Sequence, residues 1–200
     1  MIDGCQALDL PSTFKYERNI GLGEDVKHIR DGVSFEKMFS LLDKMLIPAA
    51  ARAYLVRWAI LQLLLGNSDA HGKNISLHVH PAGLVPAPMY DLVSVHAYGD
   101  QVEQSMAMGY GDVFLPEEVT PYALADFAYR TGTPTRQLAR EITRIARAIV
   151  RLAPGQAAMN IYVGEERDLV RRIADYICKQ ANYLLSIAPE VQRVKTKLFE

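Results

Sequence analysis

The chain has 200 residues, of which 50% are hydrophobic and 22% charged, and its net charge is −1. These values fit one globular domain, or one large lobe of a larger enzyme, with a buried core, and exclude a strongly basic nucleic-acid-binding protein. Only Cys5 and Cys178 are present, which argues against a disulfide scaffold or a structural zinc site and favours a reducing cytoplasm. The longest apolar stretch, residues 49–65, contains charged side chains, so we expect a buried helix there and no membrane span.

Hydrophobic spacing predicts helices along most of the chain. We expect one or two turns within residues 1–10, and then helices over residues 34–44, 48–65, 117–131, 134–153 and 164–187, followed by a short frayed helix over 189–200. Ser34 is the expected N-cap of the 34–44 helix, and Thr133 caps the 134–153 helix with Pro134 at its first position. Gly66 is the expected end of the 48–65 helix.

The periodicity changes from helical to strand-like after residue 74. Apolar and polar residues alternate over 75–80, Pro81-Ala82-Gly83 has the composition of a turn, and residues 84–88 can return as an edge strand. Asn74 and Asp91 therefore flank a predicted hairpin, which brings them back together in space.

Five polar side chains around this hairpin suggest phosphoryl transfer. Asp69 and Asn74 are five positions apart, the spacing between base and metal ligand in the kinase loop H-R-D-x-x-x-x-N. Asp69 can accept the proton of a substrate hydroxyl, while Asn74 and Asp91 offer hard oxygen ligands to Mg²⁺. Lys73 can place a charge near the transferred phosphate, and His71 can hold the loop.

The same residues allow other interpretations. The Asp-x-His-x-Lys-Asn segment is also typical of a polar turn, and Asp91 is a possible N-cap of a short helix. His78 and His80 share one strand face and, with Asp69 and His71, suggest a zinc site, although no further ligand has convincing spacing. A metallohydrolase that uses Asp69, His71, His78 and Asp91 is therefore an alternative hypothesis for the function.

Two strings resemble segments of a known family. GNSDAHGKNISL and PMYDLVS resemble the G-N-x-D-x-H-x-K-N-x-S and Y-D-[ILV]-x-S segments of the HipA-like serine/threonine kinases, which are toxins of bacterial toxin–antitoxin pairs. CQALDLPSTFKYE and QSMAMGYGD resemble two further family segments, so the similarity spans residues 1–115. The resemblance implies that Asp69 is the catalytic base, that Asn74 and Asp91 bind Mg²⁺, and that Lys73 and His71 complete the catalytic loop.

The resemblance also implies a fold, cofactors and partners. We expect a mainly α, protein-kinase-like C-terminal helical lobe with a small β-hairpin at the catalytic loop, formed by residues 1–200. The family uses ATP and Mg²⁺ to phosphorylate a protein hydroxyl, on a substrate of the translation apparatus such as an aminoacyl-tRNA synthetase. Its partner is a small DNA-binding, HipB-like antitoxin, through which any contact with DNA is indirect.

The chain departs from the family in one respect. Family members are about twice as long and carry an N-terminal lobe with a glycine-rich loop and a nucleotide-binding lysine, whereas G-x-G-x-x-G does not occur in residues 1–200. We therefore expect a C-terminal lobe that is incomplete as a kinase unless another segment or chain supplies the N-lobe. The competing hypothesis is a non-catalytic remnant or binding module that docks an antitoxin or a separate N-lobe.

Overall fold

The computed structural model describes residues 1–195 and 199. Its elements are β1 (Ile2–Asp3), α1 (Gly4–Ala7), α2 (Phe35–Ser40), α3 (Pro48–Leu65), β2 (Ser76–His80), β3 (Gly83–Pro86), α4 (Pro121–Arg130), α5 (Thr135–Ala157) and α6 (Gly164–Val191). The strands form an antiparallel sheet in the order β1-β2-β3. The predicted mainly α fold with a small β-hairpin is confirmed.

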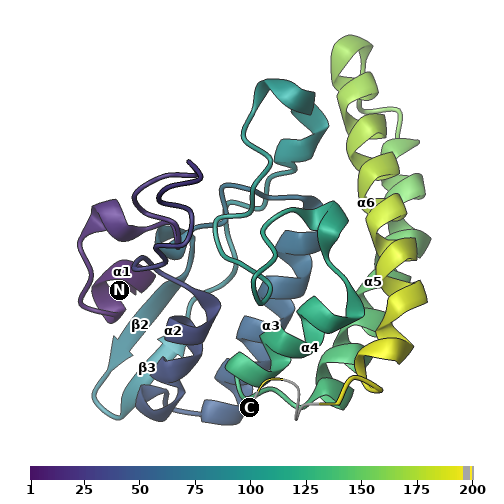
Figure 1. Cartoon of the computed structure of the whole chain (residues 1–200). Coiled ribbons are helices and arrows are strands. Elements are labelled where there is room, and N and C mark those ends of the chain that lie inside the picture. The colour runs from purple at the N-terminus through teal and green to yellow at the C-terminus, as the bar shows by residue number, and fades with distance from the viewer. Residues whose placement is uncertain (196–198, 200) are drawn as a thin grey trace.

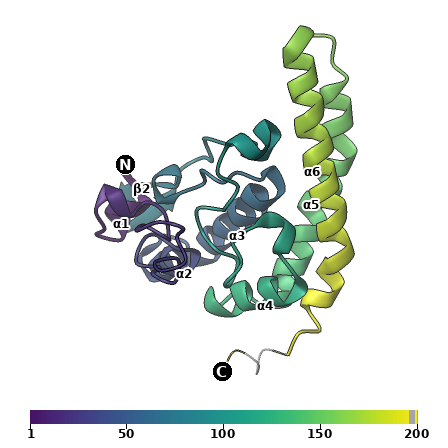
Figure 2. The same ribbon diagram turned by 45° about the horizontal axis from the view of Figure 1, so that its top comes forward.

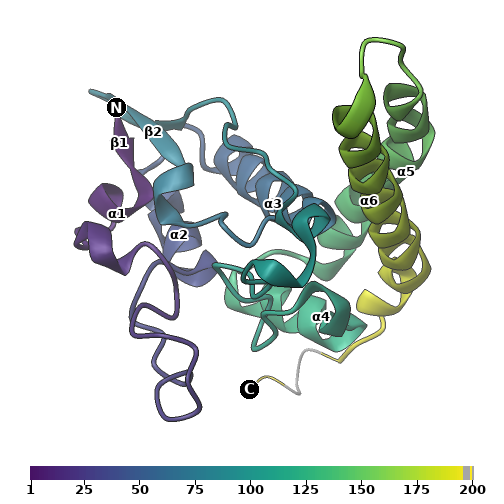
Figure 3. The same ribbon diagram turned by 90° about the horizontal axis from the view of Figure 1, so that it is seen from above.

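The elements lie in three groups (Figure 1). α3 lies near the middle, with the small sheet and α1 on one side and α4, α5 and α6 on the other. α5 and α6 run side by side, and one end of this pair extends beyond the rest of the body (Figure 2). Viewed from above, residues 18–31 form a loop that extends away from the helices (Figure 3).

α3 is the buried centre of the fold. Pro48 occupies its first turn, where a missing backbone N–H costs no hydrogen bond, and Gly66 ends it in the left-handed conformation at φ 59°. Trp58 is fully buried, and the Phe35 ring of α2 lies 6.1 Å from it and 5.2 Å from Phe127 of α4. Because this helix is rigidly packed, the loop that follows Leu65 starts from a fixed point.

Strands β2 and β3 form the predicted hairpin, and β1 adds a third strand to the sheet. Leu77 is buried opposite both Pro86 of β3 and Ile2 of β1. β1 was not predicted, because two residues are too few to show a period of two. The pairing ties the N-terminus to the strand that follows Asn74.

Two helix starts differ from the prediction. α4 begins at Pro121 and not at residue 117, because residues 116–118 form a separate 3₁₀ turn and the Thr120 hydroxyl accepts a hydrogen bond from the Ala123 N–H at 3.2 Å. α5 begins at Thr135 with Pro134 as its N-cap, so the predicted cap at Thr133 is wrong. The Thr133 hydroxyl accepts instead from the Thr131 hydroxyl at 3.0 Å.

Helix ends also differ. The predicted 34–44 helix is capped by Ser34 as expected, but it changes to a 3₁₀ turn at Leu41–Lys44. α5 continues through Pro154 to Ala157, because a proline so close to the C-terminal end removes one hydrogen bond without stopping the helix. α6 extends to Val191, and residues 192–195 follow outside it. Residues 196–198 and 200 of the predicted frayed helix lie outside the described residues.

No helix in the part of the chain that the structure describes is long and apolar enough to cross a membrane.

Candidate active site

The loop after α3 is organised by Asn67, which is fully buried. Its side-chain amide donates to Gln62 Oε1 at 2.9 Å and to the Asp91 carbonyl at 3.0 Å, and its Oδ1 accepts from the Asp69 N–H at 3.2 Å. Asn67 therefore links the end of α3, the predicted base and the predicted metal-binding segment. Periodicity does not single it out, because its partners are set by tertiary structure.

The two predicted metal ligands lie in direct contact. Asn74 is buried, and its amide nitrogen donates to Asp91 Oδ2 at 2.8 Å and to the Asp69 carbonyl at 2.9 Å. The hairpin thus closes the gap of 17 residues between Asn74 and Asp91, as predicted. A carboxylate next to an amide oxygen is a hard donor set that suits Mg²⁺, so these residues fit the expected ion.

Hydrogen bonds from residues on both sides of Asp91 fix its segment. The Tyr90 hydroxyl donates to the Lys73 carbonyl at 2.5 Å, and the Ser94 hydroxyl donates to the Leu65 carbonyl at 2.8 Å. Asp91 itself has φ 55°, in the left-handed region that aspartate tolerates better than most residues. No helix starts at Asp91, so the N-cap interpretation is wrong.

Asp69 presents its carboxylate beside a cavity. Its side chain is 51% exposed, and the Tyr16 hydroxyl donates to its Oδ1 at 2.5 Å. The cavity has a volume of about 370 Å³ and is lined by residues that include Tyr16, Arg18, Ser68, Asp69, Glu103 and Met106. A side chain that carries a hydroxyl can therefore approach Asp69 from this space.

His71 faces the interior of the loop. Its side chain is 8% exposed, and its Nε2 lies 3.0 Å from Lys15 Nζ and 3.8 Å from Asp69 Oδ1. Burial, and then the Lys15 charge, lower the pKa of His71, so the neutral imidazole accepts a hydrogen bond from the ammonium at Nε2. Lys15 was not singled out from the sequence, since it lies 56 positions from its partner.

Lys73 points to the N-terminal strand. Its ammonium donates to Asp3 Oδ2 at 2.6 Å, and this hydrogen bond raises the pKa of Lys73. Asp3 also caps α1 by accepting from the Gln6 N–H. Lys73 therefore lies on the predicted catalytic loop, but its side chain pairs with Asp3 and not with Asp69 or Asp91.

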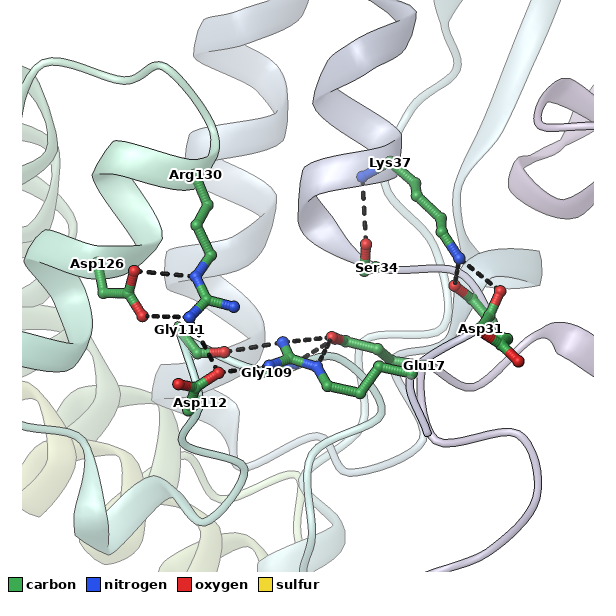
Figure 4. A network of polar contacts seen from close by, with 11 residues as sticks. Glu17, Asp31, Ser34, Lys37, Gly109, Gly111, Asp112, Asp126 and Arg130 are labelled. Carbon is green, nitrogen blue, oxygen red and sulfur yellow. Dashed lines mark hydrogen bonds and ion pairs between the residues drawn. The ribbon is translucent and has the colours of Figure 1, made fainter. Parts of the chain in front are cut away.

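A charge network around the buried Glu17 carboxylate holds the segment that follows Lys15 and Tyr16 (Figure 4). The Glu17 side chain is 2% exposed; it accepts from Arg30 and, at 2.7 Å, from the Gly109 N–H. Arg30 also donates to Asp112 at 2.6 Å, and Arg130 reaches the same carboxylate at 3.0 Å. Burial raises the pKa of Glu17 although Arg30 and the Gly109 N–H act in the opposite direction.

Glu17→Ala is expected to lower the free energy of unfolding by about 3 kcal/mol, because it leaves Arg30 and the Gly109 N–H without their buried partner. Chemical denaturation of the chain measures this change. Glu24→Ala is the matched control, since Glu24 forms an exposed pair with Lys27 and its removal costs little. Equal stability of the two variants would contradict a structural role for the Glu17 network.

The zinc alternative is not supported. Across residues 1–195 and 199, no three His, Cys, Asp or Glu side chains are grouped so that they could hold one metal ion. His78 and His80 lie exposed on the hairpin, and the His80 ring accepts from the Ala82 N–H.

Comparison with known proteins adds sequence and structural relatives. A sequence model of the HipA-like C-terminal domain matches residues 1–153. The serine/threonine-protein kinase toxin HipA of Shewanella oneidensis is 49% identical over 149 residues, which make up 74% of this chain and 34% of that protein. The solved complex of HipA, HipB and operator DNA from Shewanella oneidensis MR-1 contains a chain that superposes with a TM-score of 0.91 at 40% identity.

The structural match covers 97% of this chain and 46% of the solved one. The chain thus spans half or less of the length of these relatives, and the similarity extends over its helical part as well as over the loop and hairpin.

Proposed function

The chain belongs to the HipA-like C-terminal domain family, and we propose that it is the catalytic lobe of a serine/threonine protein kinase that acts as the toxin of a toxin–antitoxin pair in the cytoplasm. The observation that supports this most strongly is the contact of 2.8 Å between Asn74 and Asp91. In this contact the Asn74 amide N–H donates to the Asp91 carboxylate, so the two side chains that offer oxygen ligands suited to Mg²⁺ lie side by side next to Asp69, which lines a cavity.

In this proposal each residue of the loop has a separate role in phosphoryl transfer. Asp69 accepts the proton of a serine or threonine hydroxyl while the hydroxyl oxygen bonds to the γ-phosphorus of ATP and the bond to the bridging oxygen breaks, so that ADP leaves with the electron pair. Asn74 Oδ1 and the Asp91 carboxylate would hold Mg²⁺, which when bound neutralises charge on the nucleotide phosphates. His71 and Lys73 hold the loop through Lys15 and Asp3.

The proposal includes partners. A nucleotide-binding N-lobe covers the site and carries the glycine-rich loop that residues 1–200 do not contain. This N-lobe belongs to the same protein or to another chain. By analogy with the Shewanella complex, a HipB-like antitoxin binds the kinase and provides the contact with operator DNA. The substrate is a protein hydroxyl, for example on an aminoacyl-tRNA synthetase.

The test uses the full chain fused behind the segment of the Shewanella kinase that precedes the matched region. With γ-labelled ATP, Mg²⁺ and casein as the probe substrate, this fusion is expected to transfer phosphate to serine or threonine, and chelation of Mg²⁺ is expected to abolish the transfer. A folded fusion that transfers no phosphate but still binds a HipB-like antitoxin would contradict the proposed kinase activity. It would support the alternative, a non-catalytic binding module.

A further inference from the structure

Two consecutive residues, Lys15 and Tyr16, contact the catalytic loop at three points. The Lys15 carbonyl accepts from the Gly72 N–H at 2.9 Å, and Lys15 Nζ lies 3.0 Å from His71 Nε2. The Tyr16 hydroxyl donates to Asp69 Oδ1 at 2.5 Å, across 53 positions of sequence. The dipeptide therefore contacts both ends of the Asp69–Gly72 segment.

The Lys15-Tyr16 dipeptide is itself packed against residues 32 and 33. A Cβ at Gly32 would lie only 1.8 Å from the Tyr16 carbonyl oxygen, so residue 32 passes as close to this segment as glycine permits. On either side of Tyr16, the Val33 N–H donates to the Phe14 carbonyl at 2.9 Å and the Gly32 N–H donates to the Glu17 carbonyl at 3.1 Å. The Tyr16 ring also packs edge-on against His71, with centroids 5.1 Å apart. The Tyr16 hydroxyl thus has little freedom to move.

The hydrogen bond leaves one oxygen of Asp69 available. Tyr16 occupies Oδ1, and among the residues that the structure describes no donor contacts Oδ2. Tyr16 and Asp69 line the same cavity of about 370 Å³. A carboxylate fixed through one oxygen can direct the other at an incoming hydroxyl.

We propose that Tyr16 is a positioning residue for phosphoryl transfer: its hydroxyl holds Asp69 through Oδ1 so that Oδ2 faces the hydroxyl of the acceptor. This inference rests on the proposed function, in which Asp69 is the base. Burial and the contact with Asp69 raise the pKa of Tyr16, so the phenol stays protonated and remains a donor at any working pH. Lys15 holds His71 in the same way, through the contact between Lys15 Nζ and His71 Nε2.

The experiment compares Tyr16→Phe, Asp69→Asn and the double variant in the fusion, with casein as the substrate probe. Tyr16→Phe keeps the ring and removes only the donor. Its kcat is expected to fall about 10–100-fold, since a misplaced catalytic group costs rate, while KM for casein and the affinity for ADP stay within about twofold. Tyr122→Phe is the control, because Tyr122 is half exposed on α4, away from the loop.

The double variant distinguishes positioning from a general structural effect. If Tyr16 acts through Asp69, Tyr16→Phe adds no further loss once Asp69 is asparagine. A Tyr16→Phe kcat within twofold of wild type, or a loss that adds in full to that of Asp69→Asn, would overturn the inference. Full activity of Asp69→Asn would instead overturn the proposed function, so the two failures are distinguishable.

Discussion

Asp69→Asn in the fusion is expected to lower kcat for phosphoryl transfer to casein by about 10²–10⁴-fold, the usual contribution of a general base. Asparagine has the shape of aspartate and still accepts the Tyr16 hydrogen bond, but its amide cannot take the proton of the acceptor hydroxyl. The affinity for ADP should stay unchanged, because Asp69 contacts Asn74 through its backbone carbonyl and not through its side chain. Steady-state transfer of labelled phosphate, together with calorimetry of ADP binding, measures both quantities.

Asp25→Asn serves as the control for this substitution, since Asp25 is exposed in the loop of residues 18–31. Its kcat should equal that of wild type. Retention of more than about a tenth of the wild-type kcat by Asp69→Asn lies outside the range for a general base and would assign the role of base to another residue.

The parts of the fold that followed from sequence are those in which local pattern and burial agree. The apolar stretch of α3, between Pro48 and Gly66, and the alternating residues of β2 each have one periodicity and clear ends. α4 starts four residues after the predicted position, although Glu117 and Glu118 suit a first helical turn. The Thr120-Pro121 pair, a cap followed by a proline at the first position, was the signal that marks its actual start.

The candidate site was predictable where spacing carried the information. Asp69 and Asn74 were predicted from their five-position spacing, and Asp91 from its place after the predicted hairpin; the structure brings the Asn74 and Asp91 side chains into contact. The residues that hold them were not identified, because the partners of Tyr16 and Asn67 lie 53 and 24 positions away and follow no period. Such contacts depend on how the N-terminal segment packs on the loop, which single-residue patterns do not encode.

Asp91→Ala is expected to weaken Mg²⁺-dependent nucleotide binding by at least about 100-fold, since loss of a metal ligand should cost no less than loss of a residue that only orients one. Alanine also tolerates the left-handed backbone at φ 55° less well than aspartate, so the control needs the same backbone conformation in order to separate strain from loss of the ligand. Asp9→Ala is the matched control, because Asp9 has φ 56°, is exposed and lies outside the site.

The most direct test of the metal site is a calorimetric titration of the fusion with ADP, in Mg²⁺ and in chelator, for wild type, Asp91→Ala and Asp9→Ala. We predict that Mg²⁺ strengthens ADP binding to wild type and to Asp9→Ala, and that Asp91→Ala binds in Mg²⁺ as weakly as wild type does in chelator. Equal, Mg²⁺-dependent binding by wild type and Asp91→Ala would contradict the account, because Asn74 and Asp91 would then not be the residues that hold the metal.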